Sequence, residues 1–204
     1  MKRSKTIGYL LAATVFAVAA IGVTLGFSLT RSHAQRARAG TPAMPPFGTS
    51  SSVLQQRFAV LSRRHTNKCA LRPQDVDTLA VNGRLQGSCC TPMLLNHHMR
   101  QVRGLVAYRN VSQIPRDPYD LPIALAKQLL AYDASITLTP AQQSIYMRAM
   151  KLAHEHGPCC CHCWRWPAFE GQAKYLMTRR GYSPSRIAQV WNLEDGCGGP
   201  GGTT

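Results

Sequence analysis

Pro158-Cys159-Cys160-Cys161-His162-Cys163 is the stretch around which the chain is organised, because it places four of the eight cysteines within five residues. A second pair, Cys89-Cys90, stands just before Thr91-Pro92. Both groups precede predicted helix starts, where unpaired N–H groups and the helix dipole favour a negative charge. This placement predicts lowered thiol pKa values, and thiolate is the form that binds metal.

The cysteine run has the spacing of a soft-metal site. Cys160 and Cys163 form a C-x-x-C pair, and Cys159, Cys161 and Cys163 alternate. Thiolates select Cu(I), Zn(II) or heavier soft ions. We expect copper first, with zinc or a heavy metal next, and we expect His156 to lie at the end of its helix nearest the run. The predicted ligands are Cys159, Cys160, Cys161, Cys163, Cys89, Cys90 and His156.

Two other interpretations stay open. Cys160 and Cys163 could exchange disulfides as a redox pair, although no βαβ pattern surrounds them. Alternatively, all eight cysteines could pair as disulfides that staple a structural or partner-binding module. The sequence shows no paired carboxylates, serine nucleophile or phosphate-binding loop, so the expected role requires no catalysis.

The charge of the chain is strongly positive, with 24 Lys and Arg against nine Asp and Glu, which gives +15. The basic residues are spread along the chain, and no motif for binding nucleic acid stands out. We therefore read the charge as surface electrostatics with some affinity for anionic lipid, and we expect no nucleic-acid partner.

The amino-terminal part predicts a membrane anchor. A short basic start, residues 1–6, precedes residues 7–29, which carry no charge and are long enough to cross a bilayer. Residues 30–52 predict a flexible, partly basic linker. We expect an uncleaved, single-pass signal anchor that holds the following domain outside the cytoplasm, where a protein that donates or accepts the metal would be its partner.

Residues 53–197 predict an all-α domain of five to seven helices, without a clear strand, and residues 198–204 predict a flexible tail. Ser or Thr followed by Pro marks several helix starts, since the hydroxyl caps free N–H groups and Pro suits the first turn. The first expected helix begins near Val53, and the others span residues 72–81, 92–108, 121–132, 140–156, 167–180 and 184–193.

The run at 158–163 resembles the signature of exported proteins named for a PCYCGC motif. Pro158, Cys159, Cys161 and Cys163 match, whereas Cys160 and His162 replace the Tyr and Gly of that motif. The segment ending Arg180-Gly181-Tyr182-Ser183 is also similar to the end of those proteins. The resemblance covers about 45 residues and implies export and a thiol site, without implying a substrate.

Overall fold

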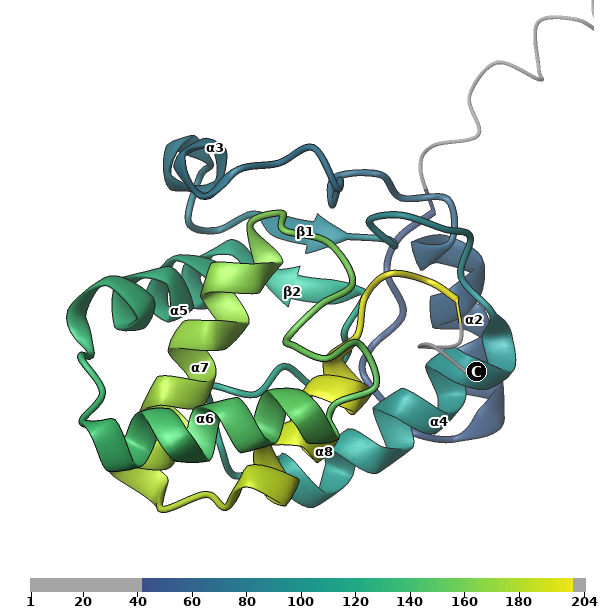
Figure 1. Ribbon diagram of the computed structural model, residues 1–204. Coiled ribbons are helices and arrows are strands. Elements are labelled where there is room, and N and C mark those ends of the chain that lie inside the picture. Colours follow the sequence, from purple (N-terminus) through teal and green to yellow (C-terminus); the bar gives the residue numbers. More distant parts are fainter. Residues whose placement is uncertain (1–41, 200–204) are drawn as a thin grey trace, which may run out of the picture. The chain divides into compact units, whose positions relative to one another are not determined.

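Helices form most of the protein, as the sequence predicts. The computed structural model describes residues 42–199, and within them it holds seven α-helices, one 3₁₀ turn and a two-stranded sheet (Figure 1). The elements are α2 (Ser51–Leu61), α3 (Pro73–Thr78), β1 (Arg84–Gln86), α4 (Leu95–Leu105), the 3₁₀ turn (Val106–Tyr108), β2 (Asp120–Pro122), α5 (Ile123–Ser135), α6 (Pro140–Leu152), α7 (Arg165–Arg180) and α8 (Pro184–Glu194).

The predicted Ser/Thr-Pro signals begin two of these helices. Thr139 caps α6 by accepting a hydrogen bond from the Gln142 N–H, and the Gln142 side chain reaches back to the Thr139 N–H. Ser183 caps α8 in the same way, by accepting from the Arg186 N–H. α7 ends as predicted, because Gly181 takes the left-handed conformation that suits a residue without Cβ.

The α6 cap gives a testable prediction. Replacing Thr139 with Ala removes one of the two reciprocal capping bonds, and we expect the free energy of unfolding to fall by about 1 kcal/mol. Urea denaturation followed by circular dichroism measures this loss. Thr178→Ala is the control, since that hydroxyl bonds a carbonyl inside α7 and caps no helix; an equal loss in both variants would contradict the capping role.

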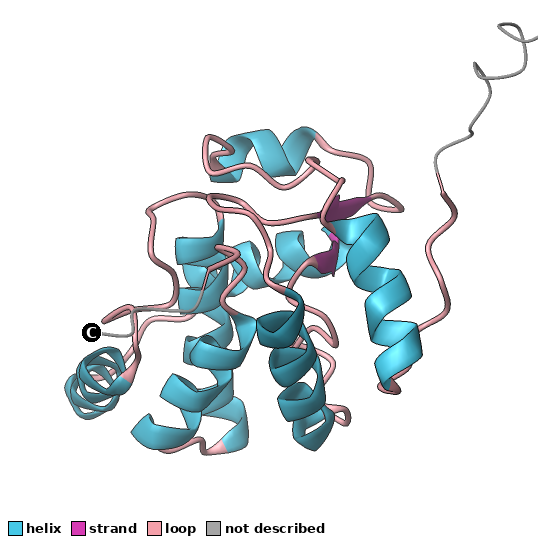
Figure 2. Ribbon diagram, turned by 90° about the vertical axis from the view of Figure 1, so that its right-hand side faces the viewer, coloured by secondary structure: helices cyan, strands magenta, loops and turns pink. Residues whose placement is uncertain are grey.

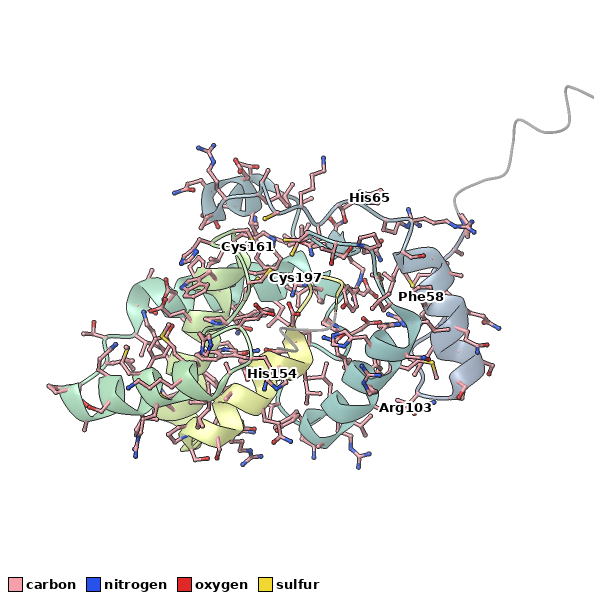
Figure 3. The ribbon with its side chains drawn as sticks, turned by 45° about the vertical axis from the view of Figure 1, so that its right-hand side comes forward. Phe58, His65, Arg103, His154, Cys161 and Cys197 are labelled. Atoms are coloured by element: carbon pink, nitrogen blue, oxygen red, sulfur yellow. A yellow bond between two sulfur atoms is a disulfide. The ribbon has the colours of Figure 1, made fainter. Side chains whose placement is uncertain are left out.

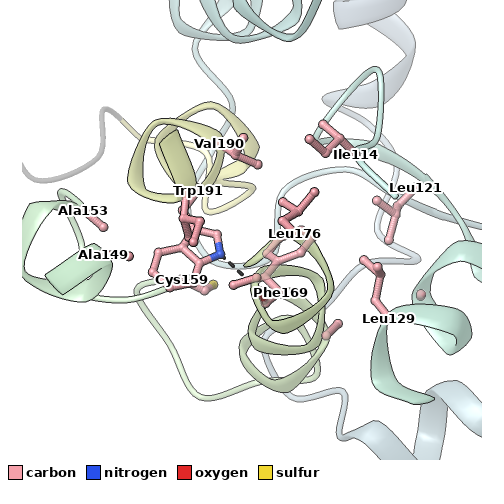
Figure 4. Packing of buried hydrophobic residues seen from close by; sticks show 14 of the residues in the cluster. Ile114, Leu121, Leu129, Ala149, Ala153, Cys159, Phe169, Leu176, Val190 and Trp191 are labelled. Carbon is pink, nitrogen blue, oxygen red and sulfur yellow. Dashed lines mark hydrogen bonds between the residues drawn. The ribbon is translucent and has the colours of Figure 1, made fainter. Parts of the chain in front are cut away.

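The core lies where α5, α6, α7 and α8 meet. α7 packs against α5, and α8 packs against α6 and α4 (Figure 1). In the view turned by 90°, helices again form most of the described part of the chain (Figure 2). Trp191 of α8 is buried beside Phe169 of α7 and donates its indole N–H to the Phe169 carbonyl at 3.2 Å (Figure 4). Cys159 belongs to the same buried cluster, so the first residue of the cysteine run is fixed by the core itself.

The expectation of a strand-free domain is wrong in one place. β1 and β2 pair antiparallel, with Leu85 opposite Leu121. Each strand has three residues, which is too short for an alternating pattern to stand out in the sequence. Both leucines are fully buried, so this small sheet ties the segment before Cys89 to the start of α5.

The helix expected from Pro92 to Tyr108 begins later, at Leu95. Thr91 does not cap it, because its N–H and hydroxyl both donate to the Cys197 carbonyl, at 2.8 and 2.7 Å. A bond to a residue far along the chain therefore replaces the local cap that the sequence suggests. α6 also ends earlier than predicted, at Leu152 instead of His156.

The predicted anchor, residues 7–29, and most of the predicted linker lie outside the described residues. Among residues 42–199, no helix combines the length and the apolar character needed to cross a bilayer. The placement of the domain outside the cytoplasm thus stays a prediction.

Candidate metal centre

Three separate segments bring the cysteines together: the loop between α6 and α7, the segment before α4, and the segment after α8 (Figure 1). The Cys89 N–H donates to the Gly196 carbonyl at 3.0 Å, which together with the two bonds from Thr91 to Cys197 fastens the chain after α8 against residues 89–91. Cys161, from the loop between α6 and α7, also lies close to Cys197 (Figure 3).

Gly198 permits this close approach. Its φ is +100°, and a Cβ at this position would collide with the Thr91 carbonyl. Only glycine adopts this conformation without strain. The glycines around Cys197, which the sequence suggests are part of a flexible end, instead let this segment lie directly on the segment that carries Cys89 and Cys90.

Asn67 joins a fourth segment to the site. It is buried, its side-chain amide donates to the Gly87 carbonyl at 3.0 Å, and its oxygen accepts from the Trp164 indole N–H at 3.0 Å. The neighbouring Cys69 donates its N–H to the Cys89 carbonyl at 3.1 Å. All eight cysteines of the chain are therefore held in one region.

The sulfur atoms lie at the spacing of a thiolate metal site. Cys89 Sγ is 3.5 Å from Cys90 Sγ and 3.6 Å from Cys197 Sγ. Cys161 Sγ is 3.6 Å from Cys90 Sγ and 4.0 Å from Cys159 Sγ. A tetrahedron with metal–sulfur bonds of about 2.3 Å has edges of about 3.8 Å, so these separations suit ligands of a shared ion.

Among the described residues, three groups of four sulfurs have their ligand atoms within 4.8 Å of one another. Every member is a cysteine. The groups are Cys89, Cys159, Cys161 and Cys163; Cys89, Cys90, Cys161 and Cys197; and Cys159, Cys160, Cys161 and Cys197.

One disulfide, Cys160–Cys197, is formed in this part of the chain, and the other six cysteines are thiols. Cys160 is exposed, whereas Cys197 is only 6% exposed. Cys160 thus pairs with Cys197 and not with Cys163, which is the partner that the redox interpretation assigns to it. The structure also differs from a fully stapled module, which needs all eight cysteines in pairs.

The thiol pKa values move opposite to our expectation. The Cys159 hydrogen bond and burial raise the pKa of Cys161 to about 12, and burial with the Cys69 hydrogen bond raises the pKa of Cys90 to about 12. The Cys159 hydrogen bond and burial also raise the pKa of Cys89. When sulfurs lie close together, a negative charge on one raises the pKa of its neighbours, and here this effect is larger than the attraction of a helix end. The helix end also acts weakly on Cys90, because four residues separate Cys90 from the first residue of α4. A cation among the sulfurs would reverse this balance by replacing their protons.

Arg165 is a fixed positive charge beside the cluster. It is fully buried, it donates to the carbonyls of Pro118 and Glu194, and its charge favours the thiolate form of Cys89. Its guanidinium also lies 5.4 Å from the Trp164 ring centroid, which orients it at the start of α7. If several of these thiols lost their protons to a bound cation, the charge of Arg165 would partly offset the negative charge of the thiolates.

Glu194, near this arginine, gives a pH prediction. Burial raises the pKa of Glu194 to about 8, although Gln172 and Arg165 act in the other direction. The pKa of Glu194 is higher in the folded state than in the unfolded state, so the folded state binds the proton more tightly. The contribution of Glu194 to the free energy of unfolding is therefore greatest at low pH. The stability is lost as the pH rises from about 4.5 to 8, at about 1.4 kcal/mol per pH unit at most.

Glu194→Gln should remove this dependence, because the amide keeps the bond from Gln172 at 2.7 Å and does not ionise. The measurement is the free energy of unfolding of both proteins at several pH values from 4.5 to 8.5. The variant should gain stability relative to the native chain as the pH rises, and a pH-independent difference between the two would disprove the assignment.

Most, but not all, predicted ligands meet. Cys159, Cys160, Cys161, Cys163, Cys89 and Cys90 each belong to at least one group of four sulfurs. His156 belongs to none; it is exposed, has a φ of +52° and lies in the loop after α6, which ends at Leu152. The ligands predicted from the sequence do not include Cys197, whose only signal is a cysteine within a glycine-rich end.

No known protein family, curated protein or solved structure matches this chain. The likeness of residues 158–163 to the PCYCGC motif stays a prediction, and the function is inferred from the site.

Proposed function

We propose that this protein binds a soft metal ion through clustered cysteine thiolates and holds it or passes it to another protein. The observation that supports this most directly is the group Cys89, Cys159, Cys161 and Cys163, four free thiols with sulfurs within 4.8 Å of one another. Four thiolates at this spacing match the ligand set of a closed, tetrahedral site.

The ligand atoms, which are all cysteine sulfurs, limit the kinds of metal ion that fit the site. Each group of four is made of cysteine alone, so soft ions such as Cu(I) and Zn(II) fit, whereas Mg²⁺ and Ca²⁺ prefer oxygen. Copper before zinc is the order that we propose from the sequence, and both ions fit a sulfur-only site.

The burial of the cysteines favours metal binding and argues against redox catalysis. Cys163, one member of the proposed redox pair, is only 4% exposed, and its pKa is raised to about 12, so its thiol is protonated at neutral pH. A nucleophilic cysteine needs the opposite, an exposed sulfur with a lowered pKa. Thiol–disulfide exchange at Cys160 and Cys163 is therefore the weaker proposal.

Exchange with a partner protein would take place at the exposed edge of the cluster. Among the free thiols, Cys90 is exposed and Cys89 and Cys161 are partly exposed, while Cys159 and Cys163 are buried. A donor or acceptor protein would therefore approach from the side of the first three. Anchoring through residues 7–29 and a location outside the cytoplasm complete the proposal.

The test is the metal content of the full-length chain, purified anaerobically without chelator, with a thiol count on the same sample. We expect at least about one copper or zinc ion per chain. The control is the same protein alkylated at its thiols before exposure to metal, which should carry none. A chain without metal and with its cysteines in four disulfides would overturn the proposal.

A further inference from the structure

The three groups of four sulfurs overlap. Cys161 belongs to all three, and Cys89, Cys159 and Cys197 belong to two each. Ions in more than one group would therefore have to share thiolates. A thiolate keeps several lone pairs after binding one soft ion, so a sulfur can bridge two such ions.

The three groups differ in whether they include a cysteine of the Cys160–Cys197 disulfide. The group Cys89, Cys159, Cys161 and Cys163, here called the free-thiol group, contains neither disulfide cysteine. Both other groups require Cys197. A sulfur in a disulfide carries no negative charge and is a poor ligand compared with thiolate.

We infer that reduction of the Cys160–Cys197 disulfide raises the number of soft metal ions that the cluster holds, from a single ion in the free-thiol group to a cluster with bridging thiolates. The inference rests on the proposed function and adds its regulation. Cys197 Sγ lies 3.6 Å from both Cys89 Sγ and Cys159 Sγ, so once released it is already at ligand spacing.

A dithiol reductant supplies the electrons. Its thiolate attacks Cys160 Sγ, which is exposed, and the Cys160–Cys197 bond breaks with its electron pair leaving on Cys197 Sγ, where a proton follows. The second thiol of the reductant then attacks the mixed disulfide and releases Cys160. Two electrons and two protons pass to the protein, the dithiol becomes a disulfide, and incoming metal displaces protons from the freed sulfurs.

The experiment compares two forms of the full-length chain under anaerobic conditions. One keeps the disulfide, and the other is reduced with a phosphine, which leaves no competing thiol. Each is titrated with Cu(I) and, separately, with Zn(II), and bound metal is counted after desalting. We expect about one tightly bound ion in the disulfide form and about two or more in the reduced form.

Two variants distinguish the effect of losing the disulfide from the effect of losing Cys197 as a ligand. Cys160→Ser prevents the bond but leaves Cys197 in the group with Cys89, Cys90 and Cys161, so it should hold the higher number without reductant. Cys197→Ser also prevents the bond but removes both other groups, so it should hold about one ion with or without reductant.

Each outcome has a distinct meaning. Equal counts in the disulfide and reduced forms, or equal counts in the two variants, would overturn the inference and leave metal binding intact. No tightly bound ion in any form would overturn the proposed function, and the inference with it.

Discussion

Replacing Cys161 with Ser is expected to weaken the binding of Cu(I) or Zn(II) by at least about 100-fold, more than the loss of a group that only orients a ligand. Cys161 is the single residue shared by all three groups of four sulfurs, so the change leaves three sulfurs in each. Serine has nearly the same shape but offers a hard, protonated oxygen to a soft ion. Cys161 is partly exposed, so the fold should tolerate the change.

Cys69→Ser is the matched control. Cys69 is a free, exposed cysteine near the same sulfurs, but it belongs to none of the three groups. Affinity is measured by competition with a chelator of known strength, and folding is checked by circular dichroism. Equal affinities of the two variants would show that Cys161 is not a central ligand.

Asp117→Ala is expected to lower the free energy of unfolding by about 3–5 kcal/mol, the range for breaking a buried ion pair. Asp117 accepts hydrogen bonds from the Arg57 guanidinium at 3.1 Å and the Tyr119 N–H at 3.1 Å, and lies 3.2 Å from His98 Nε2. Arg57 is 3% exposed and His98 is fully buried, so neither gains water in exchange. The loss is limited because Arg57 keeps its bond to Asp120.

The pH dependence of this pair has a definite sign. Burial acts to raise the pKa of Asp117, but the His98 hydrogen bond and the charges of His98 and Arg57 outweigh it, so the pKa is lowered. The stability from Asp117 is present above the ordinary pKa of an aspartate and is lost as the pH falls through the folded pKa. The native chain should therefore lose its advantage over Asp117→Ala in acid.

Urea denaturation at neutral and acidic pH measures both effects. Asp77→Ala is the control, the same substitution at an exposed position of α3, and it should change the stability by less than about 0.5 kcal/mol. A small loss for Asp117→Ala at neutral pH, comparable with that of the control, would mean that the buried pair contributes little.

Local signals explain which parts of the fold could be predicted. The starts of α6 and α8 follow from Thr139-Pro140 and Ser183-Pro184, because the cap and the first turn are contained in a few neighbouring residues. Thr91-Pro92 carries the same signal and fails, because Thr91 bonds Cys197, more than a hundred residues later. A local pattern does not contain such a contact.

The metal centre, too, could be predicted only in part from the sequence. The run at 159–163 and the pair Cys89-Cys90 are conspicuous in the sequence, and the structure brings them together. The contribution of Cys197 depends on the close approach of Gly198 to Thr91, which has no sequence signature of its own. The thiol pKa values depend on burial and on the number of neighbouring sulfurs, which the sequence does not show. The position of the cysteines before helix starts therefore predicted lowered pKa values, whereas those of Cys161 and Cys90 are raised.

X-ray absorption at the metal edge of the full-length, anaerobically purified chain tests the central claim most directly. Metal held by these cysteines should show sulfur neighbours alone, at about 2.3 Å for zinc. Nitrogen or oxygen neighbours in place of sulfur, or no metal above background, would contradict a sulfur-only metal centre.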